Sequence, residues 1–385
     1  MLRSPSFRGA EGGWPVDADL FSPSGPHVRD LGEFELIRAI TARFGRSPDV
    51  LVGPGDDAAM LAAPDGRVVV TTDLLVEGRH FRRDWSGGAD VGHKAAAQNL
   101  ADVAAMGARP TGLFVGLATP GSTELDWVLS LADGLAAECA RAGTTVAGGD
   151  ISSADTIMLG VTALGDLGGR APVLRSGARP GDIVVLAGTV GPSAAGLALL
   201  TATARTPPAP GGGSPRPASD GFSPTRADDD SLTARGWDHL LTAHRRPRPP
   251  YHLGPALAAL GARAMCDVSD GLLQDVGHLA AASGVRIDLT TDAFPIDDAL
   301  RGAADHLGVD PLDWVLTGGE DHALVACLPP LPPSVALPPG CVRIGSVQSD
   351  GTGVTVDGRT PTGVGGWTHF GRSTSNHPDR PHSPE

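Results

Sequence analysis

The chain of 385 residues contains a single lysine, Lys94, and its other basic residues are arginines. With one lysine, the phosphate-binding loop GxxxxGK[ST] is missing, so any nucleotide must be held in another way. The sequence is also short of positive charge overall, with a formal net charge of −14. This balance argues against nucleic acid or an anionic membrane as the main partner.

Long apolar runs and closely spaced cysteines are missing too. No apolar stretch approaches the roughly 20 residues that a membrane span needs, and the N-terminus lacks the apolar core of a secretory signal. We therefore expect a cytoplasmic protein. No CxxC pair occurs among the four cysteines, which we interpret as small buried apolar residues rather than a disulfide frame or a zinc site. They are Cys139, Cys266, Cys327 and Cys341.

The chain is long enough for two domains, each with its own core. Segments rich in Pro, Ser and Gly flank the periodic regions and interrupt the second one, and they bury too little apolar surface to fold. The expected organisation is a disordered leader over 1–30, an N-terminal domain over 31–169, a C-terminal domain over 170–370 with a flexible insertion at 206–230, and a disordered tail over 371–385.

Strand and helix patterns alternate irregularly in both halves. Residues 66–73 read as a β-branched strand that ends in Asp73, and residues 90–108 and 123–143 read as helices. The second half begins near Arg175 with the strand "GDIVVLAG". The irregular mixture favours an α+β, mixed-sheet fold over a strict βαβ repeat.

Carboxylates recur in the sequence at glycine turns and strand ends. Examples are "GPGDDAAM", "TTD", "AGGD", "DVSDG" and "LTGGED", and Lys94, Gln98 and Asp102 share one helix face. Each acid alone is explained by a turn or a helix cap. Together, and without matching cations, they form a hard-oxygen ligand set that suits Mg²⁺, which in turn suggests phosphates on the substrate.

The basic strip "HRRPRPP", residues 244–250, has two interpretations. Its composition could indicate a ligand for nucleic acid or for a proline-binding module. Against the negative net charge we favour a structural linker into the next helix, which could also lend an arginine to a phosphate.

Seven motifs, in order, resemble the thiamine-monophosphate kinase family. They are "GPGDDAAM", "TTDLLVEGRHF", "QNLADVAAMGARP", "AGGDISS", "RSGARPGDIVVLAG", "CDVSDGLLQD" and "LTGGEDHAL", followed by "GGWTHF" near the C-terminus. The similarity spans about residues 31 to 370 without the insertion. It implies the two-domain aminoimidazole ribonucleotide synthetase-like fold, in which the N-terminal domain binds ATP and metal and its strands form a barrel in a homodimer.

The resemblance also assigns roles to residues of this sequence. The implied magnesium ligands are Asp57, Thr71, Thr72, Asp73, Asp102, Asp150, Asp267 and Asp270. The implied ATP contacts are Gly149, Asp150, Arg175 and Ser269, and the implied thiamine-phosphate pocket contains His80, Glu320 and Trp367. Where the family commonly has "GEDYEL", this chain has "GEDHAL", so His322 and Ala323 replace a tyrosine and a glutamate.

Several of these residues have structural alternatives. His80 and Arg175 could be ordinary surface residues instead of a positioning donor and a fork on ATP phosphate. Trp367 could cover an apolar edge rather than stack on the cationic thiamine ring. Glu320 could sit near a helix C-cap or pair with the aminopyrimidine of the substrate.

The implied reaction transfers the γ-phosphoryl group of ATP to thiamine monophosphate and gives thiamine diphosphate. The accepting phosphate has a second pKa near ~6, so it needs charge neutralisation and in-line positioning rather than a strong base. The alternatives are another ATP-using member of the superfamily, of the hydrogenase-maturation or purine-synthesis type, and a non-catalytic nucleotide-binding protein.

Overall fold

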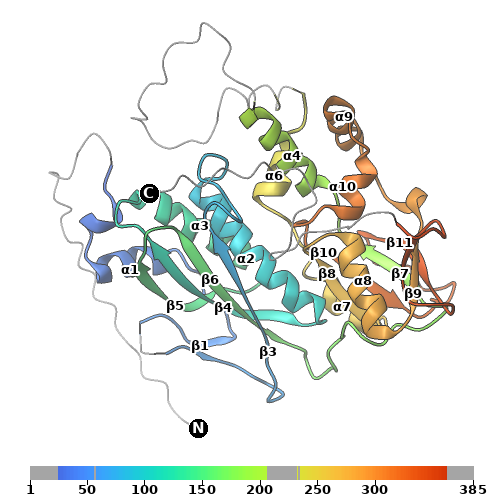
Figure 1. Ribbon diagram of the computed structural model, residues 1–385. Coiled ribbons are helices and arrows are strands. Elements are labelled where there is room, and N and C mark those ends of the chain that lie inside the picture. The colour runs from blue at the N-terminus through green and yellow to red at the C-terminus, as the bar shows by residue number, and fades with distance from the viewer. Residues whose placement is uncertain (1–24, 56–57, 206–231, 233–234, 362–385) are drawn as a thin grey trace, which may run out of the picture.

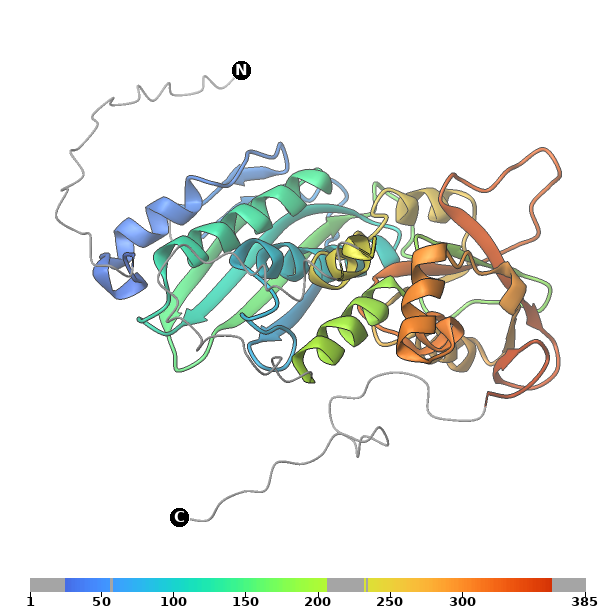
Figure 2. The ribbon, with the colours of Figure 1, turned by 90° about the horizontal axis from the view of Figure 1, so that it is seen from above.

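The computed structural model describes residues 25–55, 58–205, 232 and 235–361 (Figure 1). Two layered halves lie side by side, the first built on a four-stranded sheet and the second on a six-stranded sheet (Figure 2). This arrangement confirms the predicted α+β class. The insertion at 206–230, the tail at 371–385, Asp57 and Trp367 lie outside the described residues.

The sheet of the first half has the strand order β3-β6-β4-β5. β4 and β5 pair in parallel, and the other neighbours are antiparallel. Along β6, every second residue is buried, so one face of the sheet is covered by helices. The other, the open face, is exposed at β3 and β6 and meets Leu61 of the preceding β-hairpin at Gly112 of β4. The strands are β3 (Val69–Val76), β4 (Arg109–Thr119), β5 (Val146–Ser153) and β6 (Met158–Asp166).

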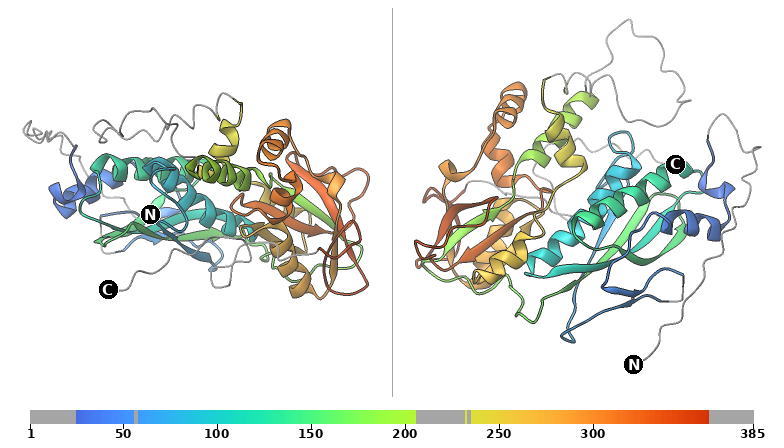
Figure 3. Two further views of the ribbon diagram at one scale, coloured as in Figure 1. Left: turned by 45° about the horizontal axis from the view of Figure 1, so that its top comes forward. Right: turned by 180° about the vertical axis from the view of Figure 1, so that it is seen from behind.

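Helices α2 (Gly88–Ala105) and α3 (Leu125–Arg141) form a layer over the covered face (Figure 3). They approach each other closely because glycines line their contact. A Cβ at Gly92 would lie 2.0 Å from the carbonyl oxygen of Leu131, and one at Gly134 would lie 2.1 Å from that of Ala89. α2 is accordingly buried over most of its length.

The first described residues precede α1 (Glu33–Thr41) and β1–β2 (Val50–Val52, Met60–Leu61). Residues Val28–Asp30 form a 3₁₀ helix, and the backbone N–H of Val28 donates to Thr123 O at 2.8 Å. The leader predicted over residues 1–30 is therefore too long at its C-terminal end, since this stretch finds hydrogen-bond partners in the turn before α3. Residues 1–24 lie outside the described chain.

The sheet of the second half has the order β12-β9-β11-β7-β10-β8, and of its described neighbours β12 and β9 pair in parallel while the others are antiparallel. Its strands are β7 (Ile183–Ala187), β8 (Ala264–Val268), β9 (Arg286–Leu289), β10 (Ala323–Leu328), β11 (Cys341–Gln348) and β12 (Gly353–Val356). The helices are α4 (Pro192–Arg205), α6 (Asp238–Arg245), α7 (Leu253–Ala259), α8 (Leu272–Ser283), α9 (Asp298–Leu307) and α10 (Pro311–Thr317).

One apolar core joins the two halves. It contains Leu100 and Val103 of α2 together with Leu324 and Ala326 of β10 and Leu257 of α7. A second core fills the space between the opposite face of the six-stranded sheet and its helices. Because α2 packs against both sheets, its polar side chains have a fixed position relative to the loops of the second half.

The "HRRPRPP" strip connects the two halves through contacts with α2 and α3. His93 Nε2 lies 2.7 Å from Pro247 O, Arg141 donates to Pro249 O at 3.0 Å, and Arg246 forms an ion pair with Asp90 of α2. Just after the strip, the hydroxyl of Tyr251 donates to the buried Glu138. These contacts agree with the interpretation of the strip as a structural linker.

The four cysteines are free, and Cys139, Cys266 and Cys327 are buried while Cys341 is half-buried. Burial raises the pKa of each thiol, as expected for small apolar residues. Within the described part of the chain, no helix combines the length and the apolar composition that crossing a bilayer requires.

The α2–α3 contact gives a stability prediction. Gly92→Ala should lower the free energy of unfolding by about 2–3 kcal/mol, because the added methyl group forces the helices apart. Gly277→Ala in α8 is the matched control: its added methyl meets its nearest atom at 4.0 Å, and it should be neutral or stabilise by up to ~1 kcal/mol. Urea unfolding measures both, and equal effects would contradict the packing argument.

Candidate active site

The "TTD" segment lies in the middle of β3, not at its end as the sequence suggested, because β3 continues to Val76 along β6. Strand alternation therefore separates its residues. The hydroxyl of Thr71 donates to Asp102 Oδ2 of α2 at 2.7 Å, whereas that of Thr72 donates to Val161 O at 3.0 Å and accepts from Thr162. Thr71 and Asp73 thus share the face toward α2, and Thr72 lies on the open face.

Three residues at successive turns of α2 each reach a different part of the site. Lys94 contacts Glu320, Gln98 donates to the carboxylate of Asp73, and Asp102 accepts from Thr71. The backbone N–H of Asp73 also donates to Asn99 Oδ1 at 3.1 Å. The predicted helix face is confirmed. Because Lys94, Gln98 and Asp102 lie one turn apart on this face, α2 sets the distances between the groups that they contact.

Carboxylates of the two halves meet where β8 faces α2. Asp267, near the end of β8, is buried, and its Oδ2 lies 3.2 Å from Nδ1 of His322. Burial and the negative charge of Asp267 raise the pKa of Asp102 to about 7, and burial, with a further contribution from Asp267, raises the pKa of Asp73. These carboxylates destabilise one another's ionised forms, and a bound cation would relieve this repulsion.

The loop that follows β8 is organised by Asp275, a residue that the sequence analysis missed. Its Oδ2 accepts from the backbone N–H groups of Ser269, Asp270 and Gly271 at 3.1–3.2 Å. Asp275 lies in the first turn of α8 and is buried. An aspartate in the first helical turn after "SDG" is the sequence feature that could have indicated this role. Asp275 holds the loop that carries Ser269 and Asp270.

The "GGED" loop packs on the "VSD" loop. The N–H of Glu320 donates to Ser269 O at 2.8 Å, and a Cβ at Gly319 would lie 2.4 Å from the same oxygen. Glu320 and His322 have positive φ angles of 62° and 54°. Between them, Asp321 accepts from the N–H groups of Gly191 and Ser193 and so caps α4. Strained backbone held this firmly is typical of functional sites.

The side chain of Glu320 faces the first half of the protein. Its Oε2 lies 3.0 Å from Lys94 Nζ and 3.5 Å from His244 Nδ1 of α6. Burial opposes ionisation of Glu320, but Lys94 outweighs it and lowers the pKa of this carboxyl to about 2. Burial also lowers the pKa of His244 to about 3, so this imidazole is neutral.

The remaining predicted residues do not all meet in one chain. His80 lies in the turn after β3, where its Nδ1 accepts from Val76 N–H at 3.0 Å. Arg175 is exposed beside β8, since Leu174 O accepts from Met265 N–H. Gly149 and Asp150 lie in β5, at the sheet edge opposite β3, and Asp150 is exposed.

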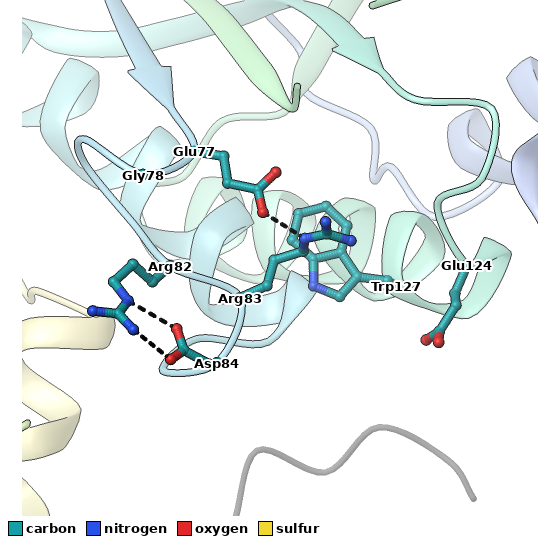
Figure 4. A pocket seen from close by; sticks show the side chains of 7 residues that line it. All are labelled: Glu77, Gly78, Arg82, Arg83, Asp84, Glu124 and Trp127. Carbon is teal, nitrogen blue, oxygen red and sulfur yellow. Dashed lines mark hydrogen bonds and ion pairs between the residues drawn. The ribbon is translucent and has the colours of Figure 1, made fainter. Parts of the chain in front are cut away.

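A cavity of about 390 Å³ lies beside the turn that carries His80 (Figure 4). Arg83 pairs with Glu77 at 2.6 Å and Arg82 pairs with Asp84, and the indole of Trp127 forms part of the wall. Trp127 Nε1 is buried and has no hydrogen-bond partner among the described residues. This cavity could not be predicted from the sequence, because its residues are ordinary in composition and converge only in the fold.

The described residues contain no group of three or more His, Cys, Asp or Glu side chains arranged to hold a metal ion by themselves. The carboxylates of Asp73 and Asp267 nevertheless lie close enough to Asp102 to raise its pKa, and the oxygens of all three are hard donors. Mg²⁺ typically takes one or two carboxylates and completes its shell with water and substrate phosphates. The residues present therefore fit magnesium as an ion shared with a phosphorylated ligand.

Comparison with known proteins identifies both halves. Residues 55–167 match the AIR synthase related protein N-terminal domain, and residues 179–356 match the corresponding C-terminal domain. The chain is 46% identical over 347 residues to the thiamine-monophosphate kinase of Mycobacterium tuberculosis. The aligned region covers 90% of this chain and 94% of that protein.

Solved structures are similar as well. The thiamine-monophosphate kinase of Stenotrophomonas maltophilia has a TM-score of 0.68 and 35% identity, and covers 86% of this chain and 98% of its own. The structure of AaThiL complexed with AMPPCP and TMP has a TM-score of 0.65 and 30% identity, and the match covers 89% of this chain and 98% of that chain.

The raised pKa of Asp102 gives a pH prediction for the metal-free protein. Because its folded pKa of about 7 exceeds the usual 3.8, the folded state holds this proton more firmly than the unfolded state, and stability is lost as pH rises from about 4 to 8. Asp102→Asn should therefore raise the unfolding temperature at pH 8 by a few degrees, with the gain fading toward pH 4.

Thermal unfolding in EDTA across this pH range tests the prediction. Asp150→Asn, on the exposed opposite edge of the sheet, is the matched control and should show no such gain. An Asp102→Asn variant that is no more stable than the wild type at pH 8 would contradict the electrostatic argument.

Proposed function

Because the chain belongs to the thiamine-monophosphate kinase family of AIR synthase-related proteins, we propose that it catalyses ATP-dependent phosphorylation of thiamine monophosphate to thiamine diphosphate. The observation that carries this proposal is the meeting of Asp73 and Asp102 with Asp267 at the junction of the two halves. A relative of the same fold is complexed with an ATP analogue and TMP.

The chemistry requires little of the protein beyond charge and position. The acceptor phosphate is largely ionised at neutral pH, so the main barrier is the approach of two anions in line. Magnesium bound to the carboxylates would neutralise the phosphates. The chain's own residues align the site: Thr71 and Gln98 orient Asp102 and Asp73, and His322 orients Asp267.

We assign the magnesium ligands to the carboxylates and hydroxyls that the resemblance implied. Thr71, Asp73, Asp102 and Asp267 are grouped at the junction, and Asp270 lies in the adjoining loop held by Asp275. Because Thr72 directs its hydroxyl to the open face, its contribution would be a backbone oxygen or a contact on that face. Asp57 and Asp150 complete the proposed set.

The nucleotide and the acceptor bind on either side of the junction in this proposal. Ser269, in the loop after β8, and Arg175, beside β8, contact ATP together with Gly149 and Asp150. Thiamine monophosphate binds near His80 and Glu320 with Trp367 on its ring. Support comes from the hydrogen bond between the "GGED" and "VSD" loops, because these neighbouring loops would hold the two substrates next to each other.

We further infer that the working unit is a homodimer built on the open face of the four-stranded sheet. Val70 and Leu74 of β3 are 59% and 57% exposed there, and Met158 of β6 is also exposed. Exposed apolar side chains gathered on one face of a sheet are typical of an interface. Leu51 and Met60 of the β1–β2 hairpin add to the exposed apolar surface of this half.

The position of Asp150 supports the same inference. β5 lies three strands away from β3, roughly 14 Å at the usual strand spacing. Asp150 therefore does not reach Asp73 within one chain. A second copy packed on the open face brings the β5 edge of one chain toward the β3 edge of the other and completes each site.

A non-catalytic nucleotide-binding role is the alternative from another class. The intact carboxylate set and the closely packed loops around it favour catalysis. Since the family match is to thiamine-monophosphate kinases, the hydrogenase-maturation and purine-synthesis activities are less favoured. We place the reaction in the cytoplasm, with neither nucleic acid nor membrane as a partner.

Chromatography after incubation with ATP, Mg²⁺ and thiamine monophosphate tests the activity. We expect thiamine diphosphate with the monophosphate as acceptor and none with free thiamine or an aminoimidazole precursor, because the acceptor must be an ionised phosphate. EDTA should abolish product. ATP binding without product formation from any acceptor would sink the kinase proposal and leave the binding role.

Subunit complementation tests the composite site. Asp73→Asn and Asp150→Asn should each abolish turnover while remaining folded. If each site takes these residues from different chains, mixed dimers contain one intact site, and random exchange of equal amounts should restore about a quarter of the wild-type activity. A mixture that stays inactive despite proven subunit exchange would show that both residues serve a site in one chain.

A further inference from the structure

The single lysine of the chain is one of its buried charged residues. Lys94 is 4% exposed and lies in α2, one turn before Gln98. Its Nζ donates to Glu320 Oε2 at 3.0 Å across the junction of the two halves, a contact between residues 226 apart in sequence. Neither the magnesium set nor the ATP contacts proposed above use this side chain.

We propose that Lys94 is a positioning residue that holds the Glu320 carboxylate in place so that its second oxygen accepts a hydrogen bond from the amino group of the substrate's pyrimidine. The inference rests on the proposed function, because it concerns the acceptor pocket of that reaction. It adds a residue and a recognition rule to that pocket: the enzyme selects an aminopyrimidine through the Lys94–Glu320 pair.

The two carboxylate oxygens of Glu320 differ in their contacts. Lys94 and His244 both approach Oε2, and within the described part of the chain no hydrogen bond reaches Oε1. The side chain is 36% exposed, so it is partly open to a ligand, whereas Lys94 is shielded behind it. A carboxylate with one oxygen fixed and the other available is a directed acceptor for an N–H donor.

The backbone around Glu320 leaves this direction little freedom. Its φ of 62° is unusual for a non-glycine residue, and its N–H is bonded to Ser269 O. Lys94 is equally fixed, because α2 is packed between the sheets. Without the ammonium group, a carboxylate in this place would lose its charge partner and turn toward water.

The neighbouring His244 does not replace the lysine. It is buried, and its Nδ1 lies 3.5 Å both from Glu320 Oε2 and from the hydroxyl of Ser193. Among the charged groups of α6 and the "GGED" loop, His322 and Asp321 interact electrostatically with Glu320, whereas Arg245 acts on His244. Of the cations near Glu320, Lys94 makes the 3.0 Å contact.

The test compares thiamine monophosphate with oxythiamine monophosphate, in which a carbonyl oxygen replaces the pyrimidine amino group. Calorimetry with a non-hydrolysable ATP analogue and Mg²⁺ measures both dissociation constants. The wild type should prefer the amino compound by 10-fold or more, since a carboxylate facing a carbonyl oxygen is left unpaired. Lys94→Met should lose most of this preference and raise KM for thiamine monophosphate more than it lowers kcat.

Two variants complete the design. Arg246→Met is the matched control: it removes another ion pair between α2 and the second half, at Asp90, and should keep the preference. Glu320→Gln should lose the preference, and Lys94→Met should add little in that background. If Lys94→Met does not fold, Lys94→Arg, which keeps the charge but moves it, should show the same KM effect with kcat retained.

Clear results would overturn the inference. A Lys94→Met variant with the wild-type preference would show that Glu320 needs no lysine, and a kcat loss that persists in the Glu320→Gln background would place Lys94 on the phosphates instead. Wild-type protein that forms thiamine diphosphate without preferring the amino compound would refute the pocket while the proposed function stands. Wild-type protein that forms no product and binds neither compound would refute both.

Discussion

Burial of α2 between the two halves is the constraint on which the rest of the site depends. Its apolar residues join the core that continues into β10 and α7, so the helix cannot shift without opening both halves. Glycine contacts with α3 fix it from the other side. What remains polar on α2 is the row from Lys94 through Gln98 to Asp102, and these residues meet Glu320, Asp73 and Thr71. The pitch of this one buried helix thus sets the distances between the groups that Lys94, Gln98 and Asp102 contact.

Charge then gives this geometry its chemical character. Near Asp267 the carboxylates of Asp102 and Asp73 repel one another, and burial sharpens the repulsion, so the pKa values of Asp73 and Asp102 rise. At the other end of the row, the opposite arrangement holds: Lys94 lowers the pKa of Glu320 to about 2. One face of α2 therefore has two different ends. Near Asp102 the negative charges require added cations, which suits a polyphosphate, and near Lys94 the charge of Glu320 is already balanced, which suits a neutral hydrogen-bond donor of the ligand.

The sequence predicted the parts of the site that depend on local pattern. The α2 row follows from helical periodicity, and the α+β class follows from irregular alternation of strand and helix patterns. Strand length was harder: Asp73 and Asp150 were expected at strand ends but lie mid-strand, because pairing with β6 and β4 extends both strands. Asp275 and Trp127 could not be assigned, since one acts through backbone N–H groups and the other lines a cavity formed by distant segments.

Sheet order separates two of the proposed metal ligands within one chain. β3 and β5 are opposite edges of the same sheet, so no side-chain rotation brings Asp150 to Asp73. The hydroxyl of Thr72 and the apolar side chains of Val70 and Leu74 share the face that none of the described helices covers. In the homodimer proposed above, a second copy on that face would cover these apolar side chains and bring Asp150 of one chain toward Asp73 of the other. Folding stability and catalysis would then depend on the same interface.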